Sequence, residues 1–108
     1  MESKPHRMSA IPRGKLYVVQ CTLDLHIADC QSLKDKRRVI KSIKQRLKNR
    51  YNVSVCEFGD LSLWQRTQLG IVTCGNERTI VDSTINTVIN FIEHVHAVTL
   101  LDVEQRII

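Results

Sequence analysis

Hydrophobic and polar residues alternate along positions 15–27, with a period of two that is typical of a strand burying one face. The odd positions from Tyr17 to Ile27 are apolar or cysteine, whereas the even positions from Gln20 to His26 are polar. Three further runs, rich in β-branched residues, cover 53–58, 65–74 and 98–108. The pattern therefore predicts four strands.

Two segments between these strands place apolar residues at the spacing of a helix, about 100° per residue. The first covers 33–50, and its apolar residues fall on one narrow arc: Val39, Ile40, Ile43 and Leu47. Ser32 is its expected N-cap, because Asp35 follows at the spacing of a capping box. The second begins after a turn at 75–76 and extends to about His96, with apolar residues over nearly half of its circumference.

The resulting order β-α-β-β-α-β predicts a ferredoxin-like α+β fold, a four-stranded antiparallel sheet with both helices on one face. Residues 15–108 form this single domain, and residues 1–14, which hold both prolines, are expected to be a flexible N-terminal arm. The other sheet face stays open. From the first strand it carries Leu16, Val18, Gln20, Thr22, Asp24 and His26, and a partly apolar open face is a candidate surface for a homodimer.

Charge adds a functional feature to the first helix, because nine of the sixteen Lys and Arg residues lie within 33–50 and the chain has a net charge of +5. The cations opposite the apolar arc are Lys34, Arg37, Arg38, Lys41, Lys44 and Lys48. Lys36 falls nearer the apolar arc and is expected to snorkel outward beside them. Like-charged pairs at this spacing cost about 0.2–0.5 kcal/mol each, so their accumulation favours an anion-binding surface over a merely solvated face.

Composition and the spacing of the cysteines argue against several other classes of protein. No apolar run approaches the roughly 20 residues of a membrane span, and no signal-peptide core is present, so a cytoplasmic location is expected. The four cysteines show neither a C-x-x-C pair nor zinc spacing: Cys21, Cys30, Cys56 and Cys74. They are predicted to be reduced, buried thiols, and neither a metal nor a cofactor is predicted.

Catalytic motifs are also missing. The sequence has no Gly-rich phosphate loop, nucleophile elbow or paired carboxylates, so no catalytic residue is assigned and a non-enzymatic role is favoured. His26 is the only suggestive acid–base residue. Trp64, the single tryptophan, either caps an edge of the core or offers a platform for base stacking. A structural ion pair is expected among Glu57, Asp60 and Arg66, across the hairpin that the second and third strands form.

Residues 25–70, LHIADCQSLKDKRRVIKSIKQRLKNRYNVSVCEFGDLSLWQRTQLG, resemble the YlxP-like family of small bacterial proteins of unknown function. The most specific pieces are 32–38, 52–55 and 64–66 together with 69–70. The resemblance implies a ferredoxin-like fold. Through the family's gene neighbours in translation initiation and ribosome maturation, it also implies a role linked to RNA or the ribosome. It implies no catalytic residues. Ala28 replaces a usual proline, and 74–77 is atypical.

The favoured function is therefore a non-catalytic RNA-binding or ribosome-associated protein whose basic helix contacts phosphates. Aromatic residues make up 5% of the chain, and the open face of the first strand has none, so backbone or duplex shape is the expected target. Neutralising about five duplex phosphates predicts a several-hundred-fold loss of affinity between about 50 and 200 mM salt. The alternative is a homodimeric interaction module that docks an acidic protein partner.

Overall fold

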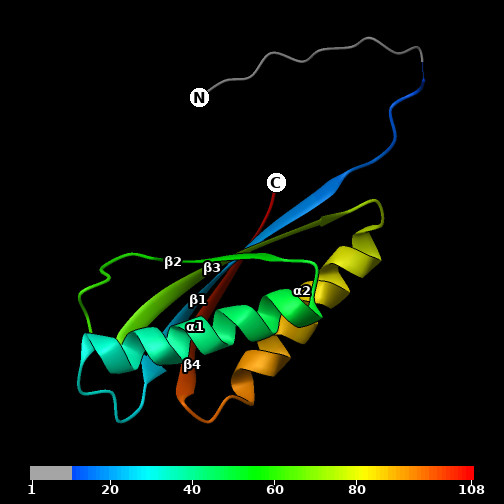
Figure 1. The fold of residues 1–108 in the computed structure, drawn as a ribbon. Helices are drawn as coiled ribbons and strands as arrows, with labels where there is room; N and C mark the ends of the chain where they lie inside the picture. The colour runs from blue at the N-terminus through cyan, green and yellow to red at the C-terminus, as the bar shows by residue number, and fades with distance from the viewer. Residues whose placement is uncertain (1–10) are drawn as a thin grey trace.

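The computed structural model describes residues 11–108 and contains the predicted order of elements (Figure 1). The elements are β1 (Tyr17–Ile27), α1 (Leu33–Arg50), β2 (Ser54–Phe58), β3 (Arg66–Gly75), α2 (Arg78–Glu93) and β4 (Val98–Ile107). Residues 1–10 of the predicted arm lie outside the described residues, and residues 11–16 reach β1 without regular secondary structure.

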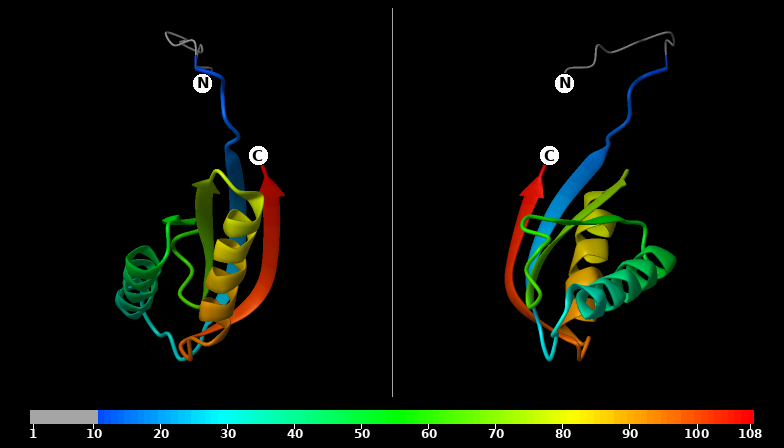
Figure 2. Two further views of the ribbon diagram at one scale, coloured as in Figure 1. Left: turned by 90° about the vertical axis from the view of Figure 1, so that its right-hand side faces the viewer. Right: turned by 60° about the vertical axis from the view of Figure 1, so that its left-hand side comes forward.

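The four strands form one antiparallel sheet in the order β2-β3-β1-β4, which confirms the ferredoxin-like α+β fold. Both helices lie on the same face of this sheet (Figure 2). The central strands are β1 and β3, so β2 and β4 each have an unpaired outer edge. The pairing of β1 with β4 shifts register between Asp24 and Leu25.

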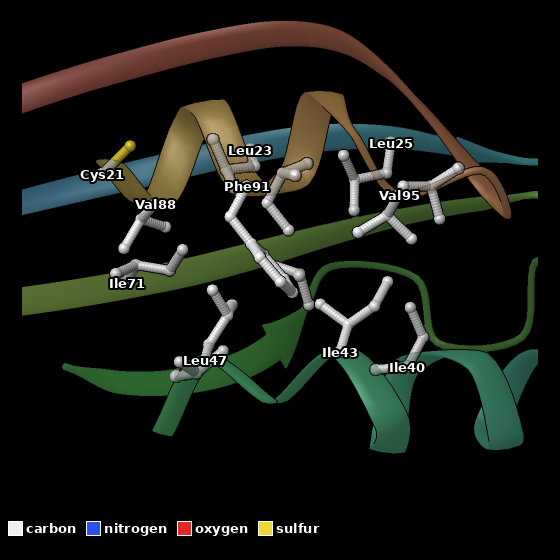
Figure 3. Packing of buried hydrophobic residues seen from close by; sticks show 14 of the residues in the cluster. Cys21, Leu23, Leu25, Ile40, Ile43, Leu47, Ile71, Val88, Phe91 and Val95 are labelled. Atoms are coloured by element: carbon white, nitrogen blue, oxygen red, sulfur yellow. The ribbon is translucent and has the colours of Figure 1, made fainter. Parts of the chain in front are cut away.

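The core lies between the sheet and the two helices (Figure 3). From β1 it takes the odd positions predicted by the alternation: Val19, Cys21, Leu23, Leu25 and Ile27. The helices cover them with α1 residues Ile40, Ile43 and Leu47 and with α2 residues Val81, Ile85, Val88, Phe91 and Ile92. Burial of each large aliphatic side chain stabilises the fold by about 1.5–3 kcal/mol, so this cluster is the main source of stability.

The two helices begin and end differently. The Ser32 hydroxyl accepts a hydrogen bond from the Asp35 N–H at 3.1 Å, which confirms the predicted cap of α1. Glu77 occupies the corresponding position of α2 but makes no capping hydrogen bond through its side chain. The α2 helix ends at Glu93, before the predicted His96, because the next amide groups bond three residues back and tighten the last turn.

The open sheet face carries the even positions of β1, as the alternation predicts. Its β2 and β3 part is exposed and mixed, with Cys56, Phe58, Val72 and Cys74 beside the polar residues Ser54, Arg66 and Gln68. The expectation of buried thiols therefore holds for Cys21 and Cys30 but is wrong for the two cysteines on this face, and all four are free. Among residues 11–108, neither helix is long and apolar enough to cross a membrane.

Candidate nucleic-acid interface

A groove with a volume of about 410 Å³ runs along the side of α1 that faces β2. Four of the predicted cations line it: Arg37, Lys41, Lys44 and Lys48. Their spacing of four, three and four residues keeps them on one side of a helix with 3.6 residues per turn. Glu57 of β2 lines the opposite wall, and Ile40 and Gln45 complete the lining.

The positive charge of this groove is not compensated by ion pairs. In the part of the chain that the structure describes, the ion pairs are Lys36–Glu57, Arg66–Asp24, Arg78–Asp82 and Arg106–Glu104. None of them involves an exposed lysine or arginine of α1. A helix face that serves only solubility usually mixes charges and forms such pairs at i,i+4. This face is therefore available to an anionic partner.

The remaining cations of α1 lie outside the groove. Lys34 and Arg38, both predicted as phosphate contacts, are exposed, and Arg38 lines a separate pocket beside Val95. Arg46 and Arg50 lie over the Phe91 ring of α2, with guanidinium carbons 4.8 and 5.4 Å from its centroid. These cation–π contacts join the C-terminal part of α1 to α2. The structure thus brings together four of the seven predicted residues.

Lys36 corrects the prediction most clearly, because its side chain is buried and does not snorkel outward. Its Nζ lies 2.9 Å from Glu57 Oε2 and donates to the Leu61 carbonyl at 3.3 Å. The Thr67 hydroxyl donates to the same carboxylate oxygen at 2.5 Å. Position 36 precedes Ile40 by one helical turn and therefore belongs to the buried arc. In this structure Lys36 therefore lies beside the core and is not exposed with the other cations of α1.

Lys36 also fixes the loop at residues 59–65, which joins β2 to β3. The loop begins at Gly59, whose φ of 82° favours glycine. Asp60 then accepts two hydrogen bonds from Ser62, at 2.6 Å from the hydroxyl and 3.0 Å from the amide. These bonds, the hydroxyl first, hold the pKa of Asp60 below its ordinary value. The loop is therefore an ordered part of the surface.

On the open face, the end of the sheet near this loop contains a pocket of about 290 Å³. Its lining residues are Asp24, Phe58, Asp60, Leu63, Arg66, Thr67 and Gln68. Arg66 Nη2 lies 2.8 Å from Asp24 Oδ2, so the predicted ion pair of Arg66 with Glu57 or Asp60 is wrong. The register explains this, because His26 opposes Arg66 and Asp24 opposes Gln68 on the same face of neighbouring strands. We call this hollow the open-face pocket.

Phe58 is an aromatic residue of the open-face pocket that the sequence prediction did not include. It is 38% exposed, and its ring lies over Gly70, where an added Cβ would be 3.6 Å from ring carbons. The sequence could have indicated this position, because successive side chains of a strand point to opposite faces of the sheet. If Glu57 faces α1, Phe58 must lie on the open face. The open face therefore does hold an aromatic residue, on β2 and not on β1.

The sequence also drew attention to Trp64 and His26, which are not in the lining of this pocket. Trp64 is 51% exposed, and its indole makes no hydrogen bond or ring contact within residues 11–108. It therefore does not cap the core. His26 lies on the open face at the end of β1, opposite Arg66. Among residues 11–108, no three His, Cys, Asp or Glu side chains group as metal ligands.

Comparison with known proteins agrees with the resemblance of residues 25–70. The chain is 40% identical over 67 residues to "Uncharacterized protein YlxP" of Bacillus subtilis (strain 168), which covers 62% of this chain and 73% of the relative. Residues 18–105, which extend from β1 into β4, match the model of a family described as "Protein of unknown function (DUF503)". The chain therefore belongs to the DUF503 family.

Proposed function

We propose that this protein binds RNA without catalysis, through phosphate contacts in the groove between α1 and β2. The observation that carries the proposal is the alignment of four cations, free of ion pairs within residues 11–108, along one groove: Arg37, Lys41 and Lys48, which are exposed, and Lys44, which is partly buried. Lys and Arg are the usual phosphate contacts of nucleic-acid-binding proteins. The RNA- or ribosome-linked role that the family resemblance implies supports this choice of polyanion.

The chemistry of the groove suits phosphate contacts in particular. Arg37 can donate two parallel hydrogen bonds to one phosphate, whereas the three lysines act as point charges that tolerate different backbone positions. From Arg37 to Lys48 the helix rises roughly 16 Å, so the row can contact several consecutive phosphates. Such contacts give affinity and orientation with little sequence information.

The affinity should depend steeply on salt, because bound cations release the counterions of the RNA. Four neutralised phosphates predict a loss of about 50-fold for a single strand, or about 150-fold for a duplex, between 50 and 200 mM salt. Fluorescence anisotropy of a labelled 20-nucleotide RNA, titrated with protein at several salt concentrations, measures this slope. A flat salt dependence would contradict the proposal.

The decisive variant replaces all four groove cations with glutamine: Arg37→Gln, Lys41→Gln, Lys44→Gln and Lys48→Gln. A matched control replaces four exposed neutral residues of α2 with glutamate: Ser83→Glu, Asn86→Glu, Thr87→Glu and Asn90→Glu. Each variant lowers the net charge of +5 by four. We expect the α1 variant to lose at least 50-fold in affinity at 50 mM salt, and the α2 variant to lose far less. Equal losses would show a net-charge effect and not a site.

A second candidate function is docking of an acidic protein segment, and the observation in its favour is the unpaired outer edge of β2 beside the groove. An extended acidic segment could add a strand there while its carboxylates meet the cations. Protein purified after nuclease treatment, with a low 260/280 nm absorbance ratio, would retain such a partner but not RNA. A homodimer through the open sheet face stays a prediction for sedimentation analysis.

A further inference from the structure

We infer that the RNA ligand is single-stranded and crosses the edge of β2, with phosphates in the α1 groove and one base stacked on Phe58 in the open-face pocket. This inference rests on the proposed function and adds the class of RNA and a base-binding residue. It joins two sites that lie on opposite faces of the sheet but share one strand.

The geometry of β2 links the two sites. Glu57 lines the groove, and the next residue, Phe58, lines the open-face pocket. Successive side chains of a strand point to opposite faces, so the path from one site to the other crosses a single strand. Because β2 is an edge strand, no further strand blocks this path. A flexible single strand can therefore occupy both sites at once.

Electrostatics assign the phosphates and the base to different sites. The groove carries four cations, whereas the pocket lining holds two aspartates, Asp24 and Asp60, and a single cation, Arg66, which is already paired with Asp24. Hydrogen bonds from Ser62 keep the pKa of Asp60 low, so its carboxylate is ionised at neutral pH. Phosphate is attracted to the groove and repelled by the pocket. The pocket suits a neutral group.

The shape and polar groups of the pocket match a nucleobase. Its volume of about 290 Å³ is at the small end of ligand sites, which fits a planar ring and not a larger ligand. Phe58 supplies an exposed aromatic face on the sheet, the surface on which RNA-binding domains of this architecture stack bases. Gln68, Arg66 and Asp24 supply donors and acceptors for a base edge.

A base inside a duplex cannot meet Phe58, because its faces are covered by its neighbours in the stack and its sugar–phosphate backbone is held in a helix. The inference therefore separates two modes of binding. Duplex RNA has the groove contacts alone, whereas single-stranded RNA adds the stacked base. The inference differs from the expectation of backbone or duplex-shape recognition, which rested on the aromatic content of 5% and on the absence of an aromatic residue from the open face of β1.

The test compares a 12-nucleotide RNA that carries one 2-aminopurine with the same RNA annealed to its complement. Phe58→Ala should weaken binding of the single strand by about 5- to 150-fold, the usual effect of removing one stacking side chain, and leave duplex binding unchanged. Phe58→Tyr should restore the affinity. Stacking should also change the 2-aminopurine fluorescence in the wild type and in Phe58→Tyr, but not in Phe58→Ala.

Val72→Ala is the matched control, because Val72 lies on the same sheet face, is 39% exposed and is outside the pocket lining. It should leave single-strand affinity unchanged. If Val72→Ala and Phe58→Ala weaken binding equally, or if Phe58→Ala has no effect, the inference is wrong although the proposed function stands. If the wild type binds neither RNA, the proposed function itself fails. Circular dichroism of each variant confirms that the fold is retained.

Discussion

The helices α1 and α2 cover the same face of the same sheet, yet their outer surfaces differ completely. The exposed side of α1 carries a row of cations without ion pairs within residues 11–108. The exposed side of α2 forms a shallow polar surface of Thr79, Asp82, Ser83, Asn86, Thr87 and Asn90, with one acidic residue. Both helices supply buried aliphatic residues to one core. The fold therefore does not require a cationic helix.

Packing against the sheet does not account for the groove cations of α1, which is why we propose an anionic partner for them. A helix with like charges at i,i+4 is less stable than one with a neutral face such as α2. Three cations of α1 are exceptions, since Lys36 is buried beside the core and Arg46 and Arg50 lie over the Phe91 ring. Substitutions in one helix, with the other helix as the reference, test whether this difference has a structural or a functional origin.

The largest effect is expected at Lys36, the cation of α1 that serves the fold. Lys36→Met leaves the Glu57 carboxylate without its partner beside the core, and we expect a loss of about 3 kcal/mol in the free energy of unfolding. Lys41→Met, at an exposed position of the same helix, should change it by less than about 0.5 kcal/mol. Urea denaturation measures both. Similar small losses would mean that Lys36 is no more structural than its neighbours.

Substitutions at the two N-caps should change the free energy of unfolding less than Lys36→Met does, and with opposite signs in α1 and α2. Ser32→Ala removes the capping hydrogen bond of α1 and should cost about 1 kcal/mol. Glu77→Ser should instead stabilise by about 0.5 kcal/mol, because the cap position of α2 is extended and lacks a side-chain hydrogen bond. Thermal unfolding of the two variants provides the measurement. A loss in Glu77→Ser would show that its charge at the helix dipole matters more than the missing cap.

A further small effect is a gain in stability from removing the groove cations. The glutamine variant relieves three like-charged neighbour pairs, Arg37/Lys41, Lys41/Lys44 and Lys44/Lys48, at about 0.2 kcal/mol each. We expect a total gain of about 0.6 kcal/mol at low salt, which disappears as salt screens the repulsion. The glutamate variant of α2 should show no such gain. Destabilisation of the glutamine variant would assign a structural role to these residues.

Thiol labelling of the wild-type protein tests whether α1 and α2 pack tightly over the sheet. Burial raises the pKa of Cys21 from 9.0 to about 11, so about one thiol in a thousand is ionised at pH 8. Iodoacetamide should therefore modify the exposed Cys56 and Cys74 but neither Cys21 nor Cys30, as read by mass spectrometry. The folded state holds the Cys21 proton more tightly, so stability should fall as pH rises from 9 towards 11.

The fold was predictable because each element carries a local pattern that its packing reinforces. The alternation of β1 identifies the buried face that the structure contains, and the capping box identifies the first residue of α1. The end of α2 was misplaced because apolar residues continue beyond Glu93 into the turn, where Val95 is buried without being helical. The spacing of apolar residues indicates which side chains are buried. It does not distinguish the last turn of a helix from a loop that packs against the core.

The candidate site was only partly predictable, since it depends on contacts between distant segments. The groove cations follow from helical spacing, but the burial of Lys36 depends on Glu57, which is 21 positions away in the sequence. The partner of Arg66 depends on the register of β1 and β3. Phe58 could have been found, because strand alternation alone directs it to the open face. Pairings across the sheet require the register, which no local pattern specifies.

The outer edge of β2 also has a consequence for solubility. A strand edge with free backbone groups can pair with the edge of another molecule, and charged side chains near it oppose this association. The α1 cations line the groove along this edge, so we expect them to oppose pairing of two copies by repulsion. The glutamine variant should therefore aggregate at lower concentration than the wild type, despite its more stable helix, and static light scattering would detect this. The surface proposed to attract RNA thus also protects the free protein from its own copies.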